Sequence, residues 1–194
     1  MIAIVDYKMG NLRSVENALK RLGAEFTVTS DAAVIRSADR VLMPGVGNAA
    51  EAMENLRAAS LVDVVRSLRR PVLGICVGMQ VMCRHSEEGD VDCLNLFDAQ
   101  VKRFEPSADL KVPHMGWNTI GNLESKLFKG IDGGEYVYFV HSYYPELCPD
   151  TIATSHHGVM FSAALKYENF YGTQFHPEKS GDVGERIIEN FLRL

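Results

Sequence analysis

The stretch Pro71-Val72-Leu73-Gly74-Ile75-Cys76-Val77-Gly78-Met79-Gln80 changes its hydrophobic pattern halfway along. Residues 71–75 form a short apolar run that predicts a strand, and residues 77–82 continue at helical spacing. Cys76 stands at the junction with a glycine two residues to each side, which is the form of a nucleophile elbow. Such a turn places the sulfur above a helix N-terminus, where free N–H groups and the helix dipole favour a thiolate. The alternative is a small buried cysteine without a chemical role.

A second motif, Gln174-Phe175-His176-Pro177-Glu178-Lys179, supplies groups that would activate this thiol. In an extended segment residues i and i+2 face the same side, so His176 and Glu178 project together, and Pro177 stiffens the chain between them. A carboxylate in that place orients the imidazole, which exchanges a proton with the thiol. Taken alone, the motif also fits a solvated loop. Together with Cys76 it predicts an enzyme that hydrolyses an amide through a Cys-His-Glu triad.

A glycine-rich turn offers a place for negative charge. The apolar residues 40–43 predict a buried strand that ends in the turn 44–48, with sequence PGVGN, before a helical period begins. Bare amides at such a turn can hold the oxyanion of a tetrahedral intermediate, together with the N–H that follows the nucleophile. The candidate donors are Gly45, Val46, Gly47 and Val77. The alternative is an ordinary strand-to-helix turn whose glycines only permit positive φ.

Strand and helix alternate through the chain on both sides of Cys76. The expected strands are 2–5, 26–29, 41–43, 135–142, 152–155 and 170–175, and the expected helices are 12–22, 49–60 and 183–192. This alternation predicts an α/β fold with a doubly wound mixed sheet flanked by helices. Functional residues of such sheets gather outside the carboxyl ends of the strands, where Gly45, Cys76 and His176 fall.

Length and composition fit this interpretation. With 194 residues, 46% of them hydrophobic, and no linker, repeat or low-complexity run, we expect one domain over residues 1–194. The net charge of −5 argues weakly against a nucleic-acid partner. Met1 leads directly into a predicted strand, and no apolar run is long enough for a membrane span, so neither a signal peptide nor membrane insertion is expected.

The four cysteines form no C-x-x-C pair, so neither a zinc site nor a disulfide framework is expected, and free thiols suit a reducing cytoplasm. The adjacent His156 and His157 are the most metal-like cluster, yet neighbours in a strand point to opposite faces, so a loop or surface role is expected for them. We therefore predict a cytoplasmic protein without a metal or cofactor. His141 is expected to have a core or supporting role, and His85 and His114 structural roles.

Longer motifs carry a resemblance to a known family over essentially the whole chain. Residues 74–80 and 174–178 resemble the signatures of class I, triad-type glutamine amidotransferases. Within that family, the chain is similar to the glutaminase subunits of imidazole glycerol phosphate synthase from histidine biosynthesis. The segments that carry this similarity are 2–15 (IAIVDYKMGNLRSV), 113–118 (PHMGWN), 139–144 (FVHSYY) and 179–180 (KS). His157 departs from the pattern, because a tyrosine is expected before Gly158.

The resemblance implies the flavodoxin-like architecture of that family, with L-glutamine as the substrate. Cys76 would attack the carboxamide, His176 would protonate the departing ammonia and later activate water, and Glu178 would orient His176. A γ-glutamyl thioester would form and hydrolyse to glutamate. The positions that match the family's glutamine-binding residues are Gln80, Glu88, Ser142 and Tyr143. A carboxylate such as Glu88 suits the ammonium of a zwitterion. Without the resemblance, Gln80 could be a surface residue and Glu88 the polar end of a helix.

The resemblance also implies a heterodimer with a (β/α)₈ cyclase subunit. The ammonia would pass to this partner, which makes imidazole glycerol phosphate and an aminoimidazole carboxamide ribotide and stimulates the glutaminase. The positions that match the expected contact are Asn11, Trp117, Lys179 and Ser180. Trp117 is the single tryptophan; it suits an interface anchor, and from its residue type alone it also suits a core.

Three other functions remain open on the sequence. A glutaminase subunit of another amidotransferase would share the triad and differ in the acceptor of the ammonia. A different cysteine hydrolase of similar fold would share Cys76 and His176 without a preference for glutamine. A catalytically silent subunit would keep the fold and bind a synthase. The intact triad chemistry disfavours the last of these.

Overall fold

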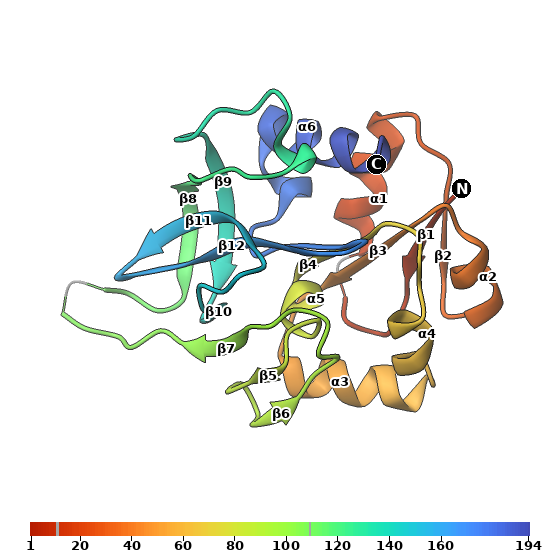
Figure 1. Cartoon of the computed structure of the whole chain (residues 1–194), viewed down its shortest axis with the longest axis horizontal. Helices are drawn as coiled ribbons and strands as arrows, with labels where there is room; N and C mark the ends of the chain where they lie inside the picture. The colour runs from red at the N-terminus through yellow and green to blue at the C-terminus, as the bar shows by residue number, and fades with distance from the viewer. Residues whose placement is uncertain (11, 109) are drawn as a thin grey trace.

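The main sheet of the protein has seven strands in the order β11-β12-β13-β4-β3-β1-β2 (Figure 1). The computed structural model describes residues 1–10, 12–108 and 110–194. The strands of this sheet are β1 (Ile2–Val5), β2 (Phe26–Thr29), β3 (Arg40–Gly45), β4 (Val72–Cys76), β11 (Thr151–His157), β12 (Val159–Tyr167) and β13 (Phe170–Thr173). Strands β2, β1, β3, β4 and β13 are parallel, and β12 and β11 continue the sheet in antiparallel pairing. The five parallel strands follow the flavodoxin-like order.

Helices cover both faces of this sheet. In Figure 1, α1 (Leu12–Arg21) and α6 (Gly181–Leu192) lie above it, and α3 (Ala49–Ala58) and α4 (Val62–Arg66) lie below it. Strands β1 and β4 are buried along their whole length, as expected of parallel strands that are covered on both sides. Arg21 Nε donates to Glu185 Oε1 at 2.8 Å and so joins α1 to α6. The predicted doubly wound mixed α/β fold is confirmed.

Two smaller sheets and several short helices complete the fold. A four-stranded sheet has the order β10-β7-β5-β6, and a hairpin pairs β8 with β9. Their bounds are β5 (His85–Ser86), β6 (Val91–Asp92), β7 (Gln100–Arg103), β8 (His114–Thr119), β9 (Tyr136–His141) and β10 (Tyr143–Pro145). The remaining elements are α2 (Ala32–Ser37), α5 (Val77–Gln80), η1 (Lys126–Phe128) and η2 (Pro177–Lys179). Among these elements, the sequence analysis had anticipated β9 and the helical start at Val77.

Several predicted boundaries are wrong. The helices expected at 49–60 and 183–192 are Ala49–Ala58 and Gly181–Leu192, and the strands expected at 152–155 and 170–175 are Thr151–His157 and Phe170–Thr173. Two further differences have a clear local cause. The strand expected at 41–43 extends from Arg40 to Gly45, because Pro44 and Gly45 still pair with Ile75 and Cys76 of β4. The helix expected over 77–82 ends at Gln80. The N–H groups of Met82 and Cys83 bond the carbonyls of Met79 and Gln80, three residues back, so the last turn is tight.

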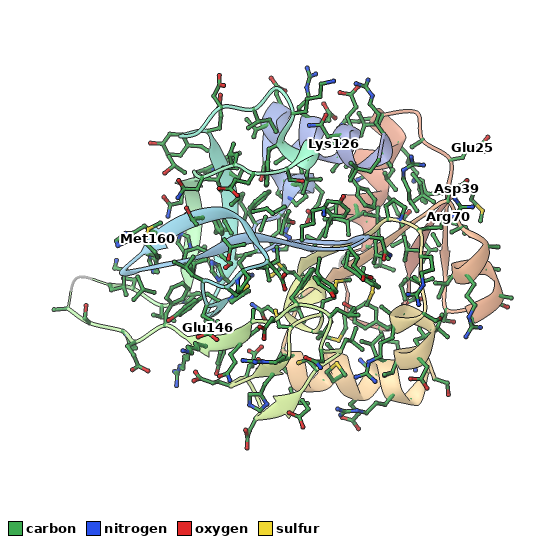
Figure 2. The ribbon with its side chains drawn as sticks, in the orientation of Figure 1. Glu25, Asp39, Arg70, Lys126, Glu146 and Met160 are labelled. Atoms are coloured by element: carbon green, nitrogen blue, oxygen red, sulfur yellow. The ribbon has the colours of Figure 1, made fainter. Side chains whose placement is uncertain are left out.

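The two ends of the parallel strands differ in character. Figure 2 shows Asp39 and Arg70 together at one edge of the molecule, where they precede β3 and β4, and Asp39 there accepts the N-terminal ammonium of Met1 at 2.5 Å. Cys76 lies at the opposite, carboxyl end of β4.

In the described part of the chain, no helix combines the length and the apolar content needed to cross a membrane.

Candidate active site

Cys76 occupies a strained turn between β4 and α5. Its φ is 55° and its ψ −113°, a conformation that side chains rarely adopt, and it is the N-cap residue of α5. The neighbouring glycines are required by close approach. A Cβ on Gly74 would lie 2.6 Å from the carbonyl oxygen of Gly78, and a Cβ on Gly78 would lie 1.7 Å from that of Met43. The predicted elbow is confirmed, together with the crowding that its glycines relieve.

His176 and Glu178 form a buried pair beside this turn. His176 Nδ1 lies 2.8 Å from Glu178 Oε1, and the two side chains are 2% and 3% exposed. The pair follows β13 and lies at the start of η2, whose Pro177 holds the turn. Ser180 Oγ donates to the carbonyl of His176 at 2.6 Å and accepts from the N–H of Tyr138 at 3.0 Å. The segment 176–180 is therefore tied to β9.

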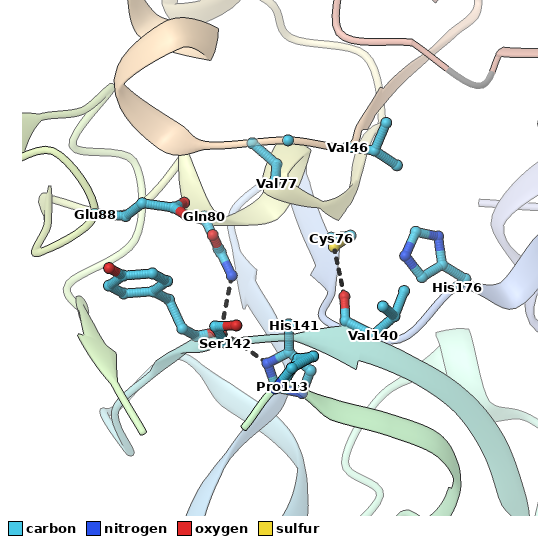
Figure 3. A pocket seen from close by; sticks show the side chains of 12 residues that line it. Val46, Cys76, Val77, Gln80, Glu88, Pro113, Val140, His141, Ser142 and His176 are labelled. Carbon is cyan, nitrogen blue, oxygen red and sulfur yellow. Dashed lines mark hydrogen bonds between the residues drawn. The ribbon is translucent and has the colours of Figure 1, made fainter. Parts of the chain in front are cut away.

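The thiol of Cys76 makes two hydrogen bonds to groups outside the triad. Its Sγ donates to the carbonyl of Val140 at 3.9 Å and accepts from Gln174 Nε2 at 3.6 Å. His176 Nε2 is buried and has no hydrogen-bond partner among the described residues. Figure 3 shows Cys76, Val140 and His176 converging on one space.

The electrostatic surroundings favour an imidazolium at His176. Burial by itself lowers the pKa of His176, but the negative charges of Cys76 and Glu178 outweigh it and raise the pKa to about 10. An imidazole that is held protonated beside a cysteine is equipped to donate a proton to a leaving group.

The predicted oxyanion segment does not present all of its amides to the pocket. The N–H of Val46 donates to the carbonyl of Met9 at 3.0 Å. This amide, expected among the oxyanion donors, is therefore engaged elsewhere. Gly45 is the last residue of β3 and pairs with Cys76. Val46, Gly47 and Val77 line the pocket that contains Cys76.

That pocket has a volume of about 300 Å³ and gathers the residues expected to hold glutamine. Those residues are Gln80, Glu88, Ser142 and Tyr143. Glu88 Oε2 accepts from the N–H of Ala49 at the start of α3 at 2.9 Å, and burial raises its pKa although this hydrogen bond opposes the rise. Gln80 is 2% exposed and is therefore not a surface residue. Its Nε2 donates to the carbonyl of Tyr143 and to Gln174 Oε1, both at 2.9 Å.

Backbone carbonyls near the pocket are already occupied. The carbonyl of Ser142 accepts from the N–H of Phe104 at 3.0 Å, and the carbonyl of Tyr143 accepts from Gln80 and from His141 Nδ1, the latter at 2.7 Å. The carbonyl of Tyr143 has two donors, so a backbone contribution of Tyr143 to glutamine binding would come from its N–H group.

Gln174 had no assigned role in the sequence analysis, and His141 was expected only in a core or supporting role. Gln174 stands within the predicted motif, and its amide bridges the thiol of Cys76 and the amide of Gln80. Alternation from His176 was a signal for it, since residues i and i−2 of an extended segment share a face. His141 lines the pocket. No sequence signal distinguished its ring from a core histidine.

The residues expected at a partner contact differ in exposure. Trp117 on β8 is 56% exposed and is therefore not a core residue, and its ring lies against Tyr138 with centroids 6.0 Å apart. Lys179 is half-buried. Ser180 is 2% exposed, because its hydroxyl is used to join His176 to Tyr138, so its side chain lies inside the molecule and not on the expected contact surface. Asn11 lies outside the described residues.

The other histidines occupy both surface and interior. Both His156 and His157 belong to β11. His156 is exposed, as expected, but His157 packs its ring on His114 at a centroid distance of 4.2 Å, so the expected loop or surface role is wrong for His157. Within residues 1–10, 12–108 and 110–194, no group of three or more His, Cys, Asp or Glu side chains is arranged to hold a metal ion.

Comparison with known proteins agrees with this arrangement. The chain is 57% identical over 194 residues to the protein named imidazole glycerol phosphate synthase subunit HisH of Bacteroides thetaiotaomicron, covering 100% of this chain and 99% of the relative. It is 49% identical to the protein of the same name from Idiomarina loihiensis, covering 100% and 97%.

Solved structures show the same fold at lower identity. A structure described as a glutamine amidotransferase has a TM-score of 0.75 at 20% identity, covering 100% of this chain and 98% of that one. A glutamine amidotransferase from Thermotoga maritima has a TM-score of 0.65 at 18% identity, covering 99% and 82%. The family profile Glutamine amidotransferase class-I matches residues 3–194. The resemblance predicted from the motifs is confirmed, and the chain belongs to the class I glutamine amidotransferase family.

Proposed function

We propose that this chain is the glutaminase subunit of an imidazole glycerol phosphate synthase. It hydrolyses L-glutamine to glutamate and ammonia and passes the ammonia to a cyclase subunit in histidine biosynthesis. The observation that carries the proposal is the convergence in one pocket of a strained Cys76 and a His176 that is hydrogen-bonded to Glu178. The names of the full-length relatives support the choice of synthase.

In the proposed mechanism the Cys76 thiolate attacks the side-chain carbonyl carbon of glutamine. The C–S bond forms, and the carbonyl electron pair moves to oxygen. His176, protonated because its pKa is raised, gives its proton to the amide nitrogen as the C–N bond breaks and ammonia leaves. The neutral imidazole then takes a proton from water, whose oxygen attacks the γ-glutamyl thioester, and glutamate departs as the thiolate returns. Glu178 holds the ring through Nδ1 in both steps.

The oxyanion donors are proposed to be the N–H of Val77 and an N–H of the segment 45–47. Because the N–H of Val46 is held by the carbonyl of Met9, the isolated chain has this donor turned away from the pocket. Rotation of the Gly45–Val46 peptide would release it, and glycine at 45 makes either peptide orientation accessible. We propose that partner docking favours the rotated state, so that ammonia is released chiefly when the cyclase can accept it.

Glu88 is proposed to hold the ammonium of glutamine, because its carboxylate is half-buried at the pocket wall. Gln80, Ser142 and Tyr143 complete the proposed binding site as further lining residues. The hydrogen bonds of Gln80 to the protein make its amide a support for the pocket, with its oxygen left for the ligand.

The cyclase is proposed to dock on the face that exposes Trp117. Met115, on the same strand, is 64% exposed, and Tyr136 on β9 is 59% exposed, which makes this face apolar. Large aromatic side chains are common anchors at interfaces. Lys179 and Asn11 are further proposed contacts. We propose a cytoplasmic location for the complex, in keeping with a free catalytic thiol.

The test is glutamate release from L-glutamine by the purified chain, alone and with the cyclase partner and its nucleotide ligand. We expect release chiefly in the complex and its loss in Cys76→Ala, while synthesis from added ammonia persists. Equal loss of both activities in Cys76→Ala would point to failed folding or docking. Cysteine-dependent release with a different synthase would favour another amidotransferase, and an unaltered glutamine-dependent activity in Cys76→Ala would identify a silent subunit.

A further inference from the structure

Histidines outside the triad form a hydrogen-bonded row that starts in the pocket. His141 lines the pocket and its Nδ1 lies 2.7 Å from the carbonyl of Tyr143 (Figure 3). A carbonyl only accepts, so Nδ1 of His141 carries the hydrogen and donates it. In the neutral ring, Nε2 is then an acceptor.

The next ring supplies the donor that this acceptor requires. His114 Nδ1 lies 2.9 Å from His141 Nε2, and so donates to it. The Nε2 of His114 is in turn an acceptor, and Asn118 Nδ2 lies 3.1 Å from it. The same amide group donates to the carbonyl of His156 at 2.9 Å, and Asn118 Oδ1 accepts from the N–H of Thr119 at 2.8 Å. These backbone partners fix the orientation of the amide, and one arrangement of hydrogens satisfies the whole row.

The surroundings keep both rings neutral. His114 is stacked between Phe139 and His157, with centroid distances of 4.7 and 4.2 Å. Burial, with a smaller contribution from His157, lowers the pKa of His114 to about 4. Burial is also the largest cause that lowers the pKa of His141 to about 3, helped by the nearby His114, His157 and His176 and opposed by the hydrogen bond to Tyr143.

The carbonyl of Tyr143 joins this row to the catalytic sulfur. It accepts from His141 on one side and from Gln80 Nε2 on the other. Gln80 continues to Gln174, and Gln174 Nε2 donates to Cys76 Sγ at 3.6 Å. Hydrogen bonds thus run from Cys76 to Asn118, which is the neighbour of the exposed Trp117 on β8.

We propose that His141 and His114, both neutral and both protonated at Nδ1, are positioning residues that fix the Tyr143 carbonyl and through it the Gln80 side of the glutamine pocket. They touch neither the scissile bond nor the thiol. Their effect on glutamine binding rests on the proposed glutaminase function, whereas the two tautomers do not depend on it.

The tautomers are tested directly by NMR of the ¹⁵N-histidine-labelled chain near neutral pH. We expect Nδ1 protonated and Nε2 unprotonated in both rings. Asn118→Asp replaces the donor to His114 by a carboxylate, so His114 would need both ring hydrogens to satisfy both neighbours, and we expect a doubly protonated His114 in this variant. An Nε2–H tautomer of either ring in the wild type would overturn the proposal.

The positioning role is tested with His114→Phe, which keeps an aromatic ring between Phe139 and His157 and removes the donor to His141. In the complex we expect the KM for glutamine to rise about tenfold, the effect of losing one buried hydrogen bond, with ammonia-dependent synthesis unchanged. His114→Gln, whose amide retains a donor, should restore part of the affinity. His156→Gln is the matched control, because it changes an exposed side chain and leaves the backbone carbonyl in place.

An unchanged KM in His114→Phe, or an equal fall in both activities, would contradict the positioning role. If the wild type itself releases no glutamate under any condition, the proposed function fails, while the tautomer measurement still decides whether the row exists.

Discussion

His176 and Glu178 are already joined at 2.8 Å and shielded from water, whereas Cys76 and Val46 are hydrogen-bonded to Val140 and Met9, contacts that the proposed mechanism requires to break. The first pair is local in sequence, two residues apart on a proline-stiffened turn. The second group depends on Met9 and Val140, which are distant in the chain. The difference teaches that the fold of this chain by itself joins the proposed base to its orienting group, whereas the proposed nucleophile and oxyanion donors are engaged by other parts of the chain.

The strongest way to break the preformed pair is Glu178→Gln. The amide keeps the shape of the side chain but removes the charge that stabilises the imidazolium and can hold the ring in the wrong tautomer. We expect a fall of about 10³- to 10⁴-fold in glutamine-dependent synthesis by the complex. Synthesis from ammonia is the internal control and should not change; a fall of less than tenfold would show that Glu178 does not orient His176.

Gly78→Ala would disturb the packing of the turn at Cys76 against β3. The added Cβ would lie 1.7 Å from the carbonyl oxygen of Met43, so β3 and the elbow must move apart. We expect the free energy of unfolding to fall by about 3 kcal/mol or more, measured by urea denaturation. Gly133→Ala is the matched control, since its Cβ would meet nothing within 4 Å. Equal stabilities of the two variants would contradict the close packing of the elbow.

Trp117→Ala tests whether the cyclase subunit docks on the face that exposes Trp117. We expect the Kd for the cyclase subunit to rise about 30-fold, as for an interface anchor, with the stability of the free chain nearly unchanged because the ring is largely exposed. Tyr167→Ala, which removes another exposed aromatic ring at the far end of β12, serves as control. Unaltered binding in Trp117→Ala would place the contact on another face.

The smallest expected effect concerns the influence of Cys76 on the pKa of His176. The negative charge of Cys76 is one of the causes that raise the pKa of His176, so Cys76→Ala should lower it from about 10 toward the ordinary value. The neutral ring becomes easier to form when the anion is removed, and we expect a fall of about one unit or more. An NMR titration of His176 in both proteins measures it. An unchanged value would mean that Glu178 and burial alone set the protonation of the ring.

The parts of the fold that could be predicted are those with a strong local pattern. The strands β1 and β4 are short apolar runs followed by turn residues, and the chain around Cys76 contains the glycines that its turn requires. The strand β12 was missed. Its sequence, VMFSAALKY, has neither clear alternation nor a turn signal that separates a strand from a helix, and its conformation is set by pairing with β11 and β13.

The same division applies to the candidate site. The proximity of His176 and Glu178 followed from their spacing, but the engagement of Val46 by Met9 required knowledge of how two loops meet. His114 and His141 lie in separate motifs, and their hydrogen bond arises from the pairing of β8 with β9. The expectation of one domain over residues 1–194 stays a prediction, as do the catalytic and binding roles.

The positive φ of Cys76 has an evolutionary consequence. A glycine at that position would adopt the same turn without the steric cost, which is about 1 kcal/mol or more for a residue with a side chain. Replacement of Cys76 by glycine would therefore raise the free energy of unfolding while removing the thiol. A copy of the gene released from selection for chemistry would drift readily toward a more stable, inert protein, so a thiol kept on this turn is the mark of a lineage in which turnover is still under selection.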